Sequence, residues 1–226
     1  MSTGEKSDPR RAAVDAAMAL VGSLAGAPLL GPAMRPFSAP LIAEHDRRIS
    51  VALLAAEQLS GLPREALAEK ISADPRHVQA LTRFLFAAGQ NGHDEILRII
   101  GASLVRNVEA LEMGGSEDSL VEENMVLIAL QDLTPLHVQV MTVIRDLNRP
   151  PEGMSQDETH VARESHVTAL VDTSPRVSRF LLASLEANGL ISHPNRYGDD
   201  EDSEFYGISE LGELVLQAAA QVHARS

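Results

Sequence analysis

The chain has 226 residues, which is enough for one large domain or two small ones. Its 32 acidic and 19 basic residues give a net charge of −13, which opposes indiscriminate binding to nucleic acid. The absence of cysteine excludes disulfides, thiolate chemistry and cysteine-ligated metal centres, and it fits a reducing compartment such as the cytoplasm. A hydrophobic content of 44% with 23% charged residues is typical of globular proteins and excludes global disorder.

The N-terminal part of the chain separates into a polar terminus and an apolar segment. Residues 1–11 are polar and contain glycine and proline, which predicts a disordered terminus. Residues 12–40 form a Gly/Pro-rich apolar segment, and no side chain from 16 to 34 is charged. This run approaches the length of about 20 residues that spans a membrane. Within it, Gly22 and Gly26 have the spacing at which two helices pack closely.

Three interpretations of residues 12–34 are open. The first is a short helix that packs on the protein or lies on its surface, followed by an irregular turn, because Pro28 and Pro32 disfavour a continuous helix. The second is a hairpin that contacts the inner face of a membrane. The third is a signal peptide, since the segment has a basic start and small residues around Gly26.

Residues 41–132 are predicted to form a helical domain. Apolar residues recur with the 3.6-residue period of a helix, and no strand-like alternation interrupts them. Asp74 before a proline predicts a helix start, and Asn91 before a glycine predicts a break. In the first helix, leucine and isoleucine positions such as Leu41 and Leu54 fit an apolar stripe that faces the core.

The pattern changes in residues 133–226, which we interpret as a winged helix-turn-helix domain with a small β-hairpin. Three helices are followed by a strand, a turn-rich loop, a second strand and a closing helix. The runs SRFLLASLEANGLIS and YGISELGELV resemble the recognition helix, wing and closing helix of MarR-like winged-helix domains. We expect a positive φ at Gly189, close packing at Gly212, and Val177 and Phe180 on the same side of the third helix as its leucines. The fold class is therefore mainly α.

The basic residues of this domain give it two interpretations. Arg176 and Arg179 begin the third helix and Arg196 lies in the wing, the positions from which winged helices contact DNA. However, residues 134–226 contain seven arginines, no lysine and 14 acidic residues, a net charge of −7. Five of the acids crowd the wing itself: Asp199, Asp200, Glu201, Asp202 and Glu204. Since this charge repels phosphate, we favour a protein partner or a homo-oligomer over nucleic acid.

No pattern in the sequence identifies a reaction. The motifs of phosphate-binding loops, dinucleotide-binding folds, zinc proteases and serine hydrolases are missing. The eight histidines are scattered, and none of their spacings offers the four ligands of a structural zinc site. We therefore expect a protein that is not an enzyme, with no catalytic residue, cofactor or metal.

Taken whole, the layout resembles the Abi-alpha family of bacterial proteins, named for abortive phage infection. Three stretches carry the resemblance: Gly22–Pro40, Asp94–Leu111 and Leu133–Ile144, the last containing LTPLHVQVM. The family has no agreed catalytic residues to carry over. The resemblance implies a role in bacterial defence against phage and nothing about mechanism. Our first hypothesis is a non-enzymatic protein of this type, with the winged helix as a protein-interaction module. The alternative is a transcription regulator that binds an operator through the three arginines named above.

Overall fold

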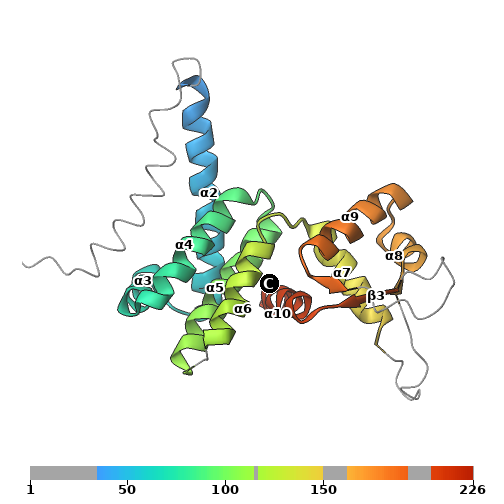
Figure 1. Cartoon of the computed structure of the whole chain (residues 1–226). Coiled ribbons are helices and arrows are strands. Elements are labelled where there is room, and N and C mark those ends of the chain that lie inside the picture. Colours follow the sequence, from blue (N-terminus) through green and yellow to red (C-terminus); the bar gives the residue numbers. More distant parts are fainter. Residues whose placement is uncertain (1–34, 115–116, 150–161, 193–204, 226) are drawn as a thin grey trace, which may run out of the picture. The chain divides into compact units, whose positions relative to one another are not determined.

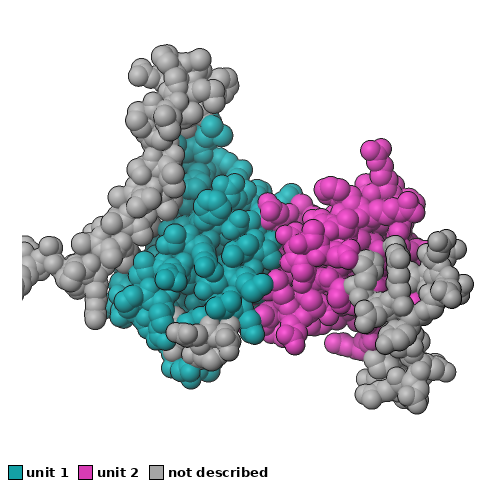
Figure 2. Space-filling view, in the orientation of Figure 1, with its two compact units in different colours: residues 1–131 teal, residues 132–226 magenta. Residues whose placement is uncertain are grey.

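A computed structural model of the chain divides into two compact units, residues 1–131 and residues 132–226 (Figure 1 and Figure 2). The sequence places its domain boundary after residue 132, one residue from this division. The predicted terminus, the apolar run with Gly22 and Gly26, and Arg196 lie outside the described residues. The structure describes residues 35–114, 117–149, 162–192 and 205–225.

The described part of the N-terminal unit is helical, as the sequence predicts. Its centre is α5, which packs against α2, α4 and α6 and is buried along most of its length. Large apolar side chains from α4 and α5, among them Phe84, Leu85 and Ile100, are fully enclosed. The helices are α2 (Arg35–Ser60), α3 (Arg64–Ala73), α4 (Pro75–Gln90), α5 (Asp94–Glu112) and α6 (Glu117–Ala129).

Helix α2 begins earlier than the sequence predicts. It starts at Arg35, so the last six residues of the predicted 12–40 segment are helical and the expected irregular turn is wrong there. Pro36 is the second residue of the helix, a position at which a backbone N–H has no intrahelical partner. The missing N–H of proline is therefore tolerated there. Pro40 lies inside the helix and removes a single hydrogen bond near its start.

The buried face of α2 is made of alanine, and the expected stripe of larger residues is wrong. Ala52 and Ala56 are fully buried, whereas Leu41 is 60% and Leu54 49% exposed. The reason lies in α5, which approaches α2 at Gly101: a Cβ there would collide with the Ala52 carbonyl oxygen. Because the two backbones come this close, only small side chains fit between them.

The helix-end signals around α4 are confirmed. Asp74 caps the helix, its carboxylate accepting a hydrogen bond from the Arg76 N–H at 2.9 Å, and a proline occupies the first helical position. Asn91 ends the helix and is itself buried. Its side-chain amide donates to the carbonyl oxygens of Leu130 (2.9 Å) and Gln131 (3.2 Å), while its Oδ1 accepts from the His93 N–H (2.9 Å). This one side chain joins the turn before α5 to the end of α6.

The C-terminal unit combines helices with a small antiparallel sheet whose strand order is β1-β3-β2. Ile191 of β2 lies opposite Ile208 of β3, which confirms the predicted hairpin. Ala162 of β1 pairs with Tyr206, so the sheet has a third strand, before α8, that the predicted order of elements does not contain. The elements are α7 (Pro135–Leu147), β1 (Ala162–Arg163), α8 (Glu164–Val171), α9 (Pro175–Ala187), β2 (Ile191–Ser192), β3 (Phe205–Ile208) and α10 (Glu210–Ala224).

Two glycines shape the hairpin as the sequence predicts. Gly189 follows α9 with a φ of 68°, a conformation that costs other residues roughly 1–2 kcal/mol. Gly212 of α10 packs against the backbone of Leu190, where a Cβ would collide with the carbonyl oxygen. A third residue, Asn148, holds the opposite edge: its side chain donates to the Tyr206 carbonyl and accepts from the Ala162 N–H, both at 2.9 Å.

Candidate functional site

Helix α9 carries Arg176 and Arg179, two of the three basic residues that the sequence singles out, and local signals at the turn after α8 position this helix. Asp172 ends α8 in the left-handed conformation, with a φ of 52°. Two residues later, Ser174 caps α9, its hydroxyl accepting from the Val177 N–H at 3.4 Å. Ser178, fully buried on α9, shares a 3.0 Å hydrogen bond with Thr173. These contacts fix the turn and therefore the direction in which α9 presents its outer face.

The outer face of α9 is partly apolar, in contrast to the sequence expectation. Leu181, Leu182 and Leu185 are buried, but Phe180 is 70% and Val177 41% exposed. Leu170 of α8 is also exposed. Among the described residues of this unit, every exposed large apolar side chain thus belongs to α8 or α9. Exposed apolar side chains are ordinary singly, and a large one such as Phe180 on the outer face of a helix is a candidate point of contact for a partner.

The two arginines of α9 differ in their surroundings. The Arg179 guanidinium donates to the Glu164 carboxylate at 2.8 Å, so part of its charge is neutralised within the unit. Because Arg179 is mostly exposed, this ion pair contributes little to stability, of the order of 0–1 kcal/mol. Arg176 is exposed and pairs with no residue that the structure describes. The Arg163 guanidinium, on β1, lies 5.4 Å from the centroid of the Phe205 ring, so it makes a cation–π contact within the sheet.

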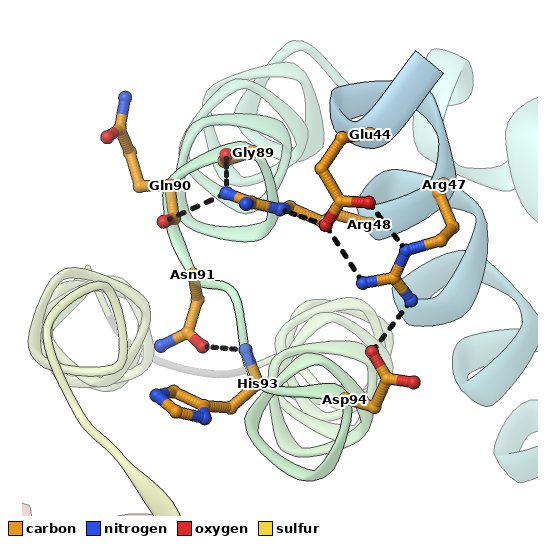
Figure 3. A network of polar contacts seen from close by, with 8 residues as sticks. All are labelled: Glu44, Arg47, Arg48, Gly89, Gln90, Asn91, His93 and Asp94. Carbon is orange, nitrogen blue, oxygen red and sulfur yellow. Dashed lines mark hydrogen bonds and ion pairs between the residues drawn. The ribbon is translucent and has the colours of Figure 1, made fainter. Parts of the chain in front are cut away.

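A second polar cluster, which the sequence analysis did not find, joins three helices of the N-terminal unit (Figure 3). The Glu44 carboxylate accepts hydrogen bonds from Arg47 and Arg48, both at 2.9 Å. Arg47 also donates to Asp94 at 2.8 Å, and Arg48 donates to the Gly89 carbonyl at 3.2 Å. The Arg48 charge at the carbonyl end of α4 complements the dipole of that helix, and the Asp94 carboxylate at the start of α5 complements the dipole of the other. The charges are matched internally, which favours a structural role.

This cluster gives a pH-dependent prediction. Hydrogen bonds from Arg47 and Arg48 lower the pKa of Glu44 from 4.5 to about 2. A carboxylate with a lowered folded-state pKa stabilises the protein above its unfolded-state pKa, and this stabilisation is lost as the pH falls through the folded value. The wild type should therefore exceed Glu44→Gln in unfolding free energy by a constant amount above pH 4.5, with the gap closing towards pH 2. Urea unfolding at a series of pH values measures the gap, and a pH-independent gap contradicts this origin.

The N-terminal unit also contains a buried ion pair that no sequence pattern predicts. The Arg106 guanidinium of α5 donates to the Glu123 carboxylate of α6 at 2.7 Å, and the two side chains are only 13% and 9% exposed. Burial raises the pKa of Glu123, although Arg106 acts in the opposite direction. Nearby on α5, Asn107 is buried, and neither polar atom of its side chain has a hydrogen-bond partner among the described residues. No sequence motif marks such a pair, because its members come from different helices.

None of the described helices is long and apolar enough to cross a membrane, and no three His, Cys, Asp or Glu residues in the described part of the chain gather where they could hold a metal ion. No protein-family model matches the chain, and no curated protein or solved structure matches it either. The candidate site is the exposed face of α9.

Proposed function

We propose that the C-terminal unit is a winged helix-turn-helix domain that binds a protein through the exposed face of α9. Two features support the domain type: the element order α7-β1-α8-α9-β2-β3-α10, and the sheet order β1-β3-β2 with β2 and β3 as the wing strands. In this arrangement α9 is the recognition helix. In accordance with the resemblance to the Abi-alpha family, we propose a non-enzymatic role in bacterial defence against phage.

The observation that carries the proposal is Phe180, 70% exposed on the recognition helix. Burying such a side chain against an apolar partner contributes about 1.5–3 kcal/mol, whereas a phosphate backbone offers it no comparable contact. The acidic residues between positions 199 and 204 and the net charge of −7 over residues 134–226 also oppose a polyanion. Arg179 is already paired with Glu164, which leaves Arg176 as the unpaired cation of this helix among the described residues.

A phage-plating assay with one matched pair of variants tests this function. Cells that produce the full chain should plate phage at least tenfold less efficiently than cells without it. Phe180→Ser should abolish the protection, because it removes the apolar contact. The control is Phe86→Ser on α4, since Phe86 is also an exposed phenylalanine, 54% accessible, and should not matter. Equal protection by both variants contradicts the use of α9.

The alternative, a transcription regulator, has its own measurement. Fluorescence anisotropy with labelled duplex fragments should detect no sequence-selective binding at any salt concentration. Selective, salt-sensitive binding that is lost in Arg176→Ala/Arg179→Ala would overturn our proposal, because backbone contacts are released as salt increases. Membrane contact through residues 12–34 stays one of the three interpretations of that segment. Flotation with liposomes tests it: a chain that does not float, and that is unchanged by deletion of residues 12–34, rejects it.

A further inference from the structure

The side chains on the exposed face of α9 are arranged so that another helix could pack against them. Residues four, three and four apart lie on one face of a helix, and on α9 these are Arg176, Phe180, Ala183 and Ala187. All four are exposed. One large apolar side chain is therefore followed, on the same face, by two small ones, so a second helix can approach the alanines closely and offer space for a phenylalanine.

The charged residues beside this face are ordered along the helix, basic before acidic. Arg179 and Glu186 are seven residues apart, so they lie on the same flank of α9, two turns from each other. Both are exposed. The basic member lies towards the start of the helix and the acidic member towards its end. A second α9 that ran parallel would place like charges side by side, whereas an antiparallel one would place each arginine beside a glutamate.

We propose that two copies of this chain associate through α9, with the helices antiparallel about a twofold axis between Leu182 and Ala183. This inference rests on the proposed function and names its partner, a second copy. In this arrangement Phe180 lies over the partner's Ala183 and the partner's Ala187, and Arg179 lies beside the partner's Glu186. Because the contact is isologous, each of these interactions occurs twice.

The existing ion pair of Arg179 does not compete with this contact. A guanidinium has five N–H donors, so Arg179 can keep its 2.8 Å contact with Glu164 while it donates to a second carboxylate. Pairing also covers Phe180, the most exposed of the large apolar side chains of α9. The recognition helix is then enclosed in the dimer, and the surface with which a winged helix enters a DNA groove is no longer accessible.

Single cysteines test the geometry, because the natural chain has none. With a rise of about 1.5 Å per residue, the two copies of position 183 differ by about 1.5 Å along the axis, and those of position 187 by about 13.5 Å. A disulfide needs Cα atoms within about 7 Å. Ala183→Cys should therefore form a cross-linked dimer on mild oxidation, and Ala187→Cys should not. Equal cross-linking of both variants, or none in Ala183→Cys, overturns the antiparallel pairing.

Charge exchange tests the contact independently. In sedimentation equilibrium we expect the wild type to dimerise, and Glu186→Arg and Arg179→Glu each to raise the dissociation constant at least tenfold. The double variant Arg179→Glu/Glu186→Arg should restore most of the affinity, because each copy then carries the exchanged pair. Phe180→Asp should be monomeric, while Phe86→Asp, with its change on α4, should still dimerise. A double variant as weak as the single ones contradicts the pairing.

The two proposals can fail separately. A wild type that is monomeric at all concentrations, with protection against phage still lost in Phe180→Ser, would overturn the dimer and leave α9 as the surface for a different protein. A dimer with these properties whose Phe180→Ser variant still protects would overturn the use of α9 in the proposed function.

Discussion

Replacing Arg106 by leucine should lower the unfolding free energy by about 3–5 kcal/mol, because it leaves the Glu123 carboxylate buried without a counter-charge. The pair is enclosed between α5 and α6, with exposed fractions of 13% and 9%. Burial already raises the pKa of Glu123, so the carboxyl of the variant should take up a proton more readily still. Denaturant unfolding measures the loss, which should be smaller at acidic pH, where the carboxyl is neutral.

Two further variants test whether the loss of stability comes from the ion pair. Arg98→Leu removes a charge from an exposed position of the same helix and should change stability by less than about 0.5 kcal/mol. Arg106→Leu/Glu123→Leu removes both charges and should recover most of the lost stability, since a buried ion pair is often replaceable by apolar residues. If the double variant is as unstable as Arg106→Leu, the ion pair is not the cause and packing around α5 is.

Gly212→Ala should destabilise the C-terminal unit by about 1 kcal/mol. Two effects oppose each other at this position. Alanine favours a helix over glycine by about 1 kcal/mol, but the new Cβ collides with the Leu190 carbonyl and comes within 3.0 Å of Ile208 Cγ2. Overpacking of this kind costs about 1–3 kcal/mol. The same carbonyl accepts the Ser209 N–H at 3.2 Å, so moving it also weakens the junction between β3 and α10.

The matched control is Gly207→Ala on β3. A Cβ there comes no closer than 3.4 Å, to the Ser192 hydroxyl, so it is tolerated. Thermal unfolding should separate the two alanine variants by several degrees, with Gly207→Ala close to the wild type. A Gly212→Ala variant that is more stable than the wild type would mean that helix propensity outweighs the close approach to Leu190.

The parts of this fold that could be predicted from the sequence are those that nearby residues determine. Asp74 and Ser174, each followed by proline, mark helix starts, because a side-chain oxygen satisfies a free backbone N–H and proline needs none. Gly189 marks a helix end because its φ of 68° favours glycine. All three signals act within four residues, so they can be recognised before any tertiary contact is known.

The remaining features depend on contacts between distant segments. Helical periodicity alone does not predict that α2 buries Ala52 and exposes Leu54. The buried face is determined by the close approach of α5 at Gly101, which leaves room only for small side chains. Likewise, Phe180 matched the apolar period of α9, but the unit covers only the side of the helix that carries Leu181 and Leu185. The candidate site is therefore an apolar residue that fits the helical period but is exposed. Its exposure can be seen only once the packing of the unit is known. The Arg47 and Arg106 ion pairs were missed for the same reason.

The amide of Asn91 also has a consequence for the ageing of the protein. An asparagine followed by glycine is the sequence most prone to lose ammonia, through attack of the following backbone nitrogen on the side-chain carbonyl. Here the amide is buried and held by two carbonyl oxygens and one N–H, which restrains that attack while the protein is folded. Once the amide is converted to a carboxylate, it faces the Leu130 and Gln131 oxygens as an acceptor against acceptors. The rate of deamidation at Asn91 would therefore depend on how often the turn between α4 and α5 opens.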